Sequence, residues 1–190
     1  MDSDEQDRTW CRQALQGDRD AASQLLHGHY SRIYAYLRRL AGNDADAADL
    51  TQEVFRKVWK SLERYREASS ISTWMHRIAY HTWVDWLRRH RPATPRSEHW
   101  WRELPGDFPS PLQAAATEES LRALWAQVDR LPEEERQVIP LHFGQQLTLV
   151  ESSAVIDMPL STLKLRLRSA LDRLRLRLKE RSGDPVNTHP

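Results

Sequence analysis

The sequence predicts an all-α protein of two small helical domains joined by a flexible linker, and the second domain contains a helix-turn-helix. Only six of the 190 residues are glycine. Apolar residues recur at three- and four-residue intervals, with little alternation of apolar and polar positions. Five prolines fall between positions 92 and 111, which indicates an irregular segment. We therefore predict a domain over residues 1–92, a linker over 93–116, a second domain over 117–182 and a disordered tail over 183–190.

Three helices account for most of the first domain. The segment after Gly17 opens a helix with an apolar stripe, and residues 42–46 interrupt it. Asp46 or a neighbouring aspartate then caps the next helix, because a short carboxylate accepts hydrogen bonds from free backbone N–H groups. A loop over residues 65–73 leads into an aromatic helix over residues 74–91.

The second domain begins with an apolar pattern that ends at Leu131, directly before a proline. Another helix starts near Glu133, and Pro140 weakens or kinks it by removing an N–H group. A short helix follows Thr148, residues 157–159 form a turn, and a long helix ends the domain. The leucines of this last segment partly alternate as in a strand, but a strand of that length is unusual, so we predict a helix.

Charge is segregated along the chain although the formal net charge is only +1. Residues 160–181 hold eight basic and two acidic side chains, a net charge of +6, whereas residues 98–135 hold three basic and nine acidic ones, a net charge of −6. This separation indicates different surfaces for nucleic acid and for another partner. The single cysteine, Cys11, excludes an intramolecular disulfide. Without a signal peptide or a membrane-length apolar run, the expected location is the cytoplasm.

Two basic helices carry the strongest functional signal. The first, over residues 74–91, combines aromatic rings with arginines, which suits unpaired bases and their phosphates, although some of the rings could simply pack in the core. The second, over residues 159–181, follows a short helix and a turn, an order that suits a helix in a duplex groove. Hairpins of two helices are also common in proteins that do not bind DNA, and the basic surplus favours DNA here.

A third segment, residues 44–59, has an acidic, polar first half and an aromatic second half. An ordinary amphipathic helix with acids at its N-terminus would give this pattern, and so would a docking surface for a basic partner. No phosphate-binding glycine loop, nucleophile elbow or metalloenzyme motif occurs. The histidine pairs His27 with His29 and His76 with His81 lack a Cys or carboxylate partner at ligand spacing. We therefore expect no enzyme activity, no metal and no cofactor.

Four of these segments, taken in order, resemble the extracytoplasmic-function (ECF) group of bacterial RNA polymerase sigma factors. They are residues 46–59, 74–89, 131–139 and 159–167, and the resemblance spans about residues 10–179. It implies that the first segment binds the polymerase clamp and that the second reads the melted minus-ten element. It also implies that the last two begin the minus-thirty-five domain and form its recognition helix.

The resemblance assigns site residues as follows. The expected polymerase-binding residues are Asp46, Asp49, Gln52, Glu53 and Arg56. The expected minus-ten residues are Ser69, Ser70, Ile71, Arg77, Tyr80, His81, Trp83, Arg88, Arg89 and Arg91, in a loop that captures a flipped base and in the helix after it. The expected minus-thirty-five residues are Ser161, Thr162, Lys164, Arg166 and Arg168.

The chain departs from the family pattern at several positions. His81 replaces the usual asparagine, and Asp157 replaces the glycine of the turn. Ser152 and Ser153 replace an Ile-Ala pair, which leaves the second domain with less apolar core, and Pro140 is unusual.

The resemblance implies a sigma factor whose partners are core RNA polymerase, promoter DNA and an anti-sigma factor, with no small-molecule substrate. We expect the anti-sigma factor to be membrane-linked, to clamp both separately mobile domains and to hold the chain at the inner membrane face. One alternative is a sigma-like adaptor that binds an anti-sigma protein without directing transcription. Another is a plain helix-turn-helix regulator, which would leave the helix over residues 46–59 unexplained.

Overall fold

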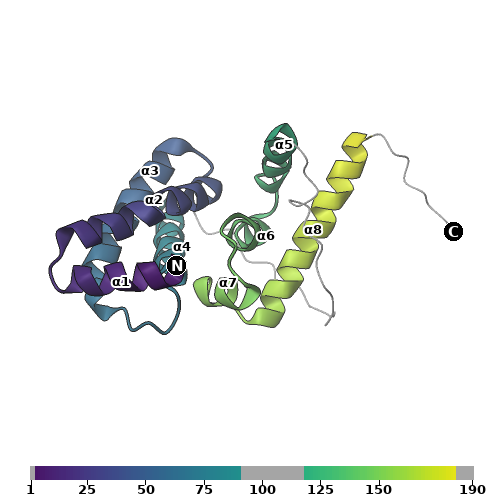
Figure 1. The fold of residues 1–190 in the computed structure, drawn as a ribbon. Helices are drawn as coiled ribbons and strands as arrows, with labels where there is room; N and C mark the ends of the chain where they lie inside the picture. Colours follow the sequence, from purple (N-terminus) through teal and green to yellow (C-terminus); the bar gives the residue numbers. More distant parts are fainter. Residues whose placement is uncertain (1–2, 91–117, 183–190) are drawn as a thin grey trace.

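The computed structural model describes residues 3–90 and 118–182, which form two helical units that pack side by side (Figure 1). No β-strand occurs within these two ranges. The predicted linker, the predicted tail and Arg91 lie outside the described residues. Within the described residues, no helix is both long and apolar enough to cross a membrane.

The N-terminal unit consists of α1 (Ser3–Leu15), α2 (Arg19–Ala41), α3 (Asp44–Ser61), the short 3-10 helix η1 (Leu62–Arg64) and α4 (Ile71–His90). Asp18 caps α2 by accepting from two backbone N–H groups of its first turn. Gly42 ends α2 at φ 85°, a left-handed conformation that costs glycine little. The cap of α3 is Asn43 rather than Asp46, because its side-chain oxygen accepts from the Asp46 N–H group. The predicted cap, Asp46 or a neighbouring aspartate, was therefore wrong, since Asn43 lies one position before Asp44 and three before Asp46.

Helix α1 was not predicted, because its segment has few apolar residues and no continuous stripe. It is anchored by two buried contacts. Cys11 packs in the core at 3% exposure, where burial raises the pKa of its thiol. His29 Nε2 lies 2.8 Å from the Asp7 carboxylate in a pair that joins α1 to α2.

The C-terminal unit consists of α5 (Glu118–Val128), α6 (Glu133–Arg136), the π-helical turn η2 (Pro140–Gly144), α7 (Leu149–Val155) and α8 (Leu160–Ser182). As predicted, no regular α-helix continues through Pro140. Thr148 and Glu151 cap α7 reciprocally, which satisfies two N–H groups that the helix leaves unpaired. The leucine-rich last segment is helical, and Leu163, Leu167, Leu171 and Leu174 are buried along its inner face.

The two units contact each other, which the sequence did not predict. Helix α4 packs against α7, and α2 packs against η2. The Arg32 side chain donates to the Gln145 carbonyl oxygen over 2.5 Å. Arg39 lies 4.5 Å from the centre of the Trp125 ring and 3.1 Å from the Asp129 carboxylate. The packing of α4 against α7 places the first helix of the helix-turn-helix against the basic aromatic helix.

Candidate nucleic-acid interface

A groove of about 560 Å³ runs between α3 and α4. It is lined by Lys57, Lys60, Ser61, Arg64, Trp74, Arg77, Ile78, His81 and Thr82. We call it the basic groove, because four of these side chains are Lys or Arg and the nine include no carboxylate. Cations with an aromatic face are the combination that holds the phosphates and the bases of a single strand.

The two helices supply different parts of the basic groove. Lys57, Lys60 and Arg64 come from the end of α3 and from η1, which directly follows it. Lys57 donates to Thr82 on α4 over 3.1 Å and approaches Glu53 at 4.0 Å, so it links the two helices that line the groove. Trp74 packs against Tyr65, with 5.3 Å between the ring centres. The aromatic wall is therefore held by the loop that precedes α4.

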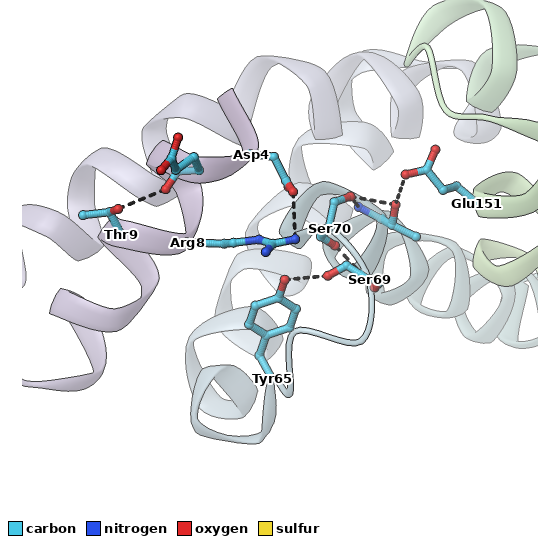
Figure 2. A network of polar contacts seen from close by, with 9 residues as sticks. Asp4, Arg8, Thr9, Tyr65, Ser69, Ser70 and Glu151 are labelled. Carbon is cyan, nitrogen blue, oxygen red and sulfur yellow. Dashed lines mark hydrogen bonds and ion pairs between the residues drawn. The ribbon is translucent and has the colours of Figure 1, made fainter. Parts of the chain in front are cut away.

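This loop is ordered by local hydrogen bonds. Tyr65 donates to the Ser69 carbonyl oxygen over 2.6 Å, and Figure 2 shows the two residues facing each other. Burial raises the pKa of Tyr65 to about 12, so its hydroxyl keeps the proton that it donates. The Ser70 hydroxyl accepts from the Thr73 N–H group over 3.1 Å and so caps the first turn of α4. Glu151 reaches Thr73 from the C-terminal unit at 3.2 Å.

The predicted minus-ten residues differ in where they lie. Arg77 and His81 line the basic groove, Ser69 and Ser70 lie half-buried in the loop beside it, and Arg88 and Arg89 are exposed near the end of α4. Tyr80 is half-buried and donates to Gln137 over 3.1 Å.

Ile71 and Trp83 need correction. Ile71 is 0% exposed and Trp83 is 1% exposed. Both side chains pack in the core, so neither can touch DNA directly in this conformation.

Sequence reasoning missed Lys57, Lys60 and Arg64. The segment over residues 44–59 was interpreted either as an ordinary amphipathic helix or as a docking surface, and Lys60 and Arg64 lie beyond its end, so this basic face was not connected with α4. The available signal was the spacing, because Lys57, Lys60 and Arg64 recur at intervals of three and four and therefore share one helix face.

The predicted polymerase-binding residues lie along α3 between Asp46 and Arg56. Asp49, Gln52 and Arg56 are exposed, whereas Asp46 and Glu53 are half-buried. Glu53 is paired with Arg56, which holds the pKa of the Glu53 carboxyl below its usual range. A smaller groove of about 260 Å³ links this face to Trp86 and Arg89 on α4.

An aromatic surface next to these residues was also missed. Tyr30 stacks on Tyr34 and on Phe55, with ring centres 6.4 and 5.6 Å apart. Tyr30 and Trp59 are 47% and 50% exposed. We call these four rings the aromatic patch. Exposed aromatic rings beside polar groups are typical of protein–protein contacts.

The predicted minus-thirty-five residues lie on the first half of α8. Ser161 and Lys164 are exposed, and Thr162 and Arg168 are half-buried. Arg166 is only 19% exposed at its side chain and pairs with Glu134 at 3.1 Å. The expectation that Arg166 faces outward is therefore wrong in this conformation. The rest of α8 is fixed to α6 by Glu135, which accepts from Ser169 over 2.7 Å and from Arg173 over 3.0 Å.

Two of the four histidines in the pairs His27 with His29 and His76 with His81 make other contacts. His29 pairs with Asp7, and His76 binds the Ser72 carbonyl oxygen through Nδ1 at 2.7 Å. Among the described residues, no three His, Cys, Asp or Glu side chains come together to hold a metal ion.

Comparison with known proteins gives matches to two family models and to several relatives. The family model described as Sigma-70 region 2 matches residues 25–93, and that described as Sigma-70, region 4 matches residues 128–176. The ECF RNA polymerase sigma factor RpoE of Cereibacter sphaeroides is 31% identical over 179 residues, which cover 91% of this chain and 97% of that protein. The ECF RNA polymerase sigma factor SigW of Bacillus subtilis is 25% identical over 177 residues, covering 89% of this chain and 95% of that protein.

Two solved structures share the fold. One is CnrH in complex with the cytosolic domain of CnrY, with a TM-score of 0.67 at 22% identity, covering 92% of this chain and 98% of that one. The other is the sigma factor RpoE of Bartonella quintana in complex with the anti-sigma factor NepR, with a TM-score of 0.63 at 19% identity, covering 83% of this chain and 96% of that one.

Proposed function

We propose a function for this chain from the premise that it belongs to the extracytoplasmic-function group of RNA polymerase sigma factors. It acts as an alternative sigma factor: it binds core RNA polymerase and directs promoter-specific initiation, with no chemistry of its own. The domains that carry this function are residues 1–92 and 117–182, separated by a linker over 93–116.

The basic groove is the observation that carries the minus-ten assignment. Single-stranded DNA presents phosphates along one edge and flat bases along the other. Lys60, Arg64 and Arg77 bind the phosphates, while Trp74 offers a ring on which a base stacks. The half-buried loop residues Ser69 and Ser70 lie at the start of α4, where a flipped base meets hydroxyl groups.

The polymerase surface is the first half of α3 together with the aromatic patch. Asp49 and Gln52 supply the exposed polar contacts, and Phe55 and Trp59 continue on the same helix with apolar area. A basic, partly apolar partner surface complements this combination.

The minus-thirty-five surface is the exposed edge of the first turns of α8. Ser161 lies at the helix start, where hydroxyl and free N–H groups meet a phosphate. Lys164 is exposed one turn further on. Arg166 joins the DNA contact only if it leaves Glu134, so in the free chain we assign it first to the packing of α6 against α8.

An anti-sigma factor holds this chain inactive. Support comes from the two structural neighbours, one in complex with the cytosolic domain of CnrY and the other in complex with the anti-sigma factor NepR. We propose that the partner of this chain is membrane-linked and keeps the sigma factor at the cytoplasmic face of the inner membrane. Co-purification from uninduced cells should recover it, and recovery of polymerase alone would count against it.

Run-off transcription with core polymerase tests the proposed function. A genomic promoter library transcribed with and without the chain should yield a defined set of start sites that depend on it. An adaptor that only binds an anti-sigma protein would give no start sites. A helix-turn-helix regulator would bind duplex DNA without associating with core polymerase.

A further inference from the structure

The turn of the helix-turn-helix contacts the basic groove. Asp157, between α7 and α8, accepts two hydrogen bonds from one Arg77 nitrogen, at 3.0 and 3.1 Å. His81 Nε2 lies 3.8 Å from the same carboxylate. We call the contact of Asp157 with Arg77 and His81 the Asp157 latch. Both partners on α4 line the basic groove, so the latch engages groups that the minus-ten strand needs.

Asp157 holds this position in an unfavourable backbone conformation. Its φ is 53°, in the left-handed region that most side chains avoid and that Asp tolerates better than most. The family pattern has a glycine at this turn, which would adopt the same conformation without strain. The aspartate adds a carboxylate that reaches the opposite unit.

A second contact brings the units together at another point. Arg32 on α2 donates to the carbonyl oxygen of Gln145 over 2.5 Å, and its Nε lies 3.4 Å from the Gln145 side-chain oxygen. Neither residue lines the basic groove or belongs to the predicted polymerase surface. We call the arrangement in which the two units contact each other the closed arrangement. Arg32 therefore reports on the closed arrangement independently of the DNA-binding groups.

The closed arrangement affects the three proposed surfaces unequally. Asp49 and Gln52 on α3 and Lys164 on α8 stay exposed. Arg77 and His81 are 49% and 46% exposed at their side chains, but both lie against the Asp157 carboxylate. The polymerase surface is therefore open while the minus-ten surface is partly occupied.

We propose that the Asp157 latch and the Arg32–Gln145 contact are autoinhibitory, an inference that rests on the proposed minus-ten function of the basic groove. In the closed chain the carboxylate of Asp157 substitutes for a DNA phosphate on Arg77. The free protein therefore binds minus-ten single strands more weakly than an opened one. Because the latch is solvent-exposed it is weak, which leaves it easy to release.

Two single variants of the full chain test the proposal, since they remove opposite charges. Asp157→Asn removes a carboxylate and keeps a residue that tolerates the left-handed turn, whereas Arg32→Ala removes a cation. Each should tighten binding to a labelled single-stranded minus-ten oligonucleotide by about twofold to fivefold, the change expected when one weak contact of a closed state is lost. Each should also raise the radius of gyration measured by small-angle X-ray scattering without DNA.

The matched controls are Asp20→Asn and Arg19→Ala, exposed charges in the first turn of α2. They should change neither measurement.

If affinity followed the charge alone, Asp157→Asn would bind more tightly and Arg32→Ala more weakly, and the proposal would be overturned. An unchanged radius of gyration in both variants would overturn it as well. If no variant and no wild type preferred the minus-ten strand to a scrambled one, the minus-ten assignment would fail, while the scattering result would still decide whether the units open.

Discussion

The guanidinium of Arg166 lies 3.1 Å from the carboxylate of Glu134, so a residue expected to face DNA instead joins the recognition helix α8 to α6. Lys164, two positions earlier, is exposed. The two cations therefore have different roles in the free protein although they stand on the same helix.

Alanine substitution should separate these roles. Arg166→Ala should lower the free energy of unfolding by about 1 kcal/mol, because it removes both a partly buried ion pair and the packing of the side-chain stem. Lys164→Ala should leave stability unchanged. It should reduce the slope of log affinity against log salt for minus-thirty-five duplex binding by the amount expected for about one lost phosphate contact. Thermal unfolding and binding titrations at several salt concentrations measure both effects. Equal effects of the two variants on stability would contradict the assignment.

Substitutions on the proposed polymerase surface should weaken binding to core polymerase without unfolding the protein. Asp49→Arg should weaken binding to core polymerase by about tenfold, because like charges at an interface repel. Trp59→Ala should weaken binding by about 2 kcal/mol, the usual cost of removing a central aromatic contact. Circular dichroism should show unchanged helix content in both variants, since both side chains are exposed. Asp20→Asn is a suitable control, and wild-type affinity in both variants would refute the surface.

The loop before α4 predicts an effect on promoter choice. Tyr65→Phe removes the hydrogen bond to the Ser69 carbonyl oxygen and leaves the ring packed against Trp74. We expect it to reduce discrimination between matched and scrambled minus-ten elements, because the loop that captures a base loses its support. Affinity for core polymerase should not change. The idea is wrong if discrimination in abortive initiation assays equals that of the wild type.

His76 predicts a pH-dependent stability. Its side chain is fully buried, and burial is the main cause that lowers its pKa from 6.5 to about 4. At neutral pH the imidazole is uncharged in both the folded and the unfolded chain, so its full contribution to the free energy of unfolding is present. As the pH falls below 6.5, His76 becomes protonated in the unfolded chain but stays neutral in the folded chain. The stability of the fold therefore declines until about pH 4. The loss is on the order of 2–4 kcal/mol.

Chemical denaturation between pH 7 and pH 5 measures this slope. His76→Leu should be less stable at pH 7, since it loses the hydrogen bond to Ser72, but its stability should depend less on pH. His27→Asn changes an exposed histidine and should keep the wild-type slope. A wild-type slope in His76→Leu would show that another group carries the dependence.

Helical periodicity was enough to predict α2, α3, α4 and α8, because each buries a stripe of apolar residues on one face. The same rule missed α1, whose few apolar residues form no stripe and which is anchored by Cys11 and the Asp7–His29 pair. Local capping chemistry limited the position of the α3 start to a few residues, and the structure chose Asn43. These differences arise where a tertiary contact or a single hydrogen bond decides the outcome.

The candidate site was only partly predictable. The aromatic and basic character of α4 was readable, but periodicity alone did not separate the buried Trp83 and Ile71 from the exposed Arg77. The contribution of Lys60 and Arg64 depends on the packing of α3 against α4, which no local pattern encodes. The contact of Asp157 with Arg77 joins residues 80 positions apart and depends on the docking of two units.

The salt dependence of minus-ten binding tests the central claim most directly. Holoenzyme assembled with the wild type and with the Lys60→Ala, Arg64→Ala double variant should be titrated with a fork-junction template whose minus-ten non-template strand is unpaired. If the basic groove holds that strand, the double variant should bind more weakly, and the slope of log affinity against log salt should shrink by about 1.4, or 0.7 for each lost phosphate contact. Arg19→Ala should behave as the wild type. An unchanged slope and affinity in the double variant would show that the melted strand lies elsewhere.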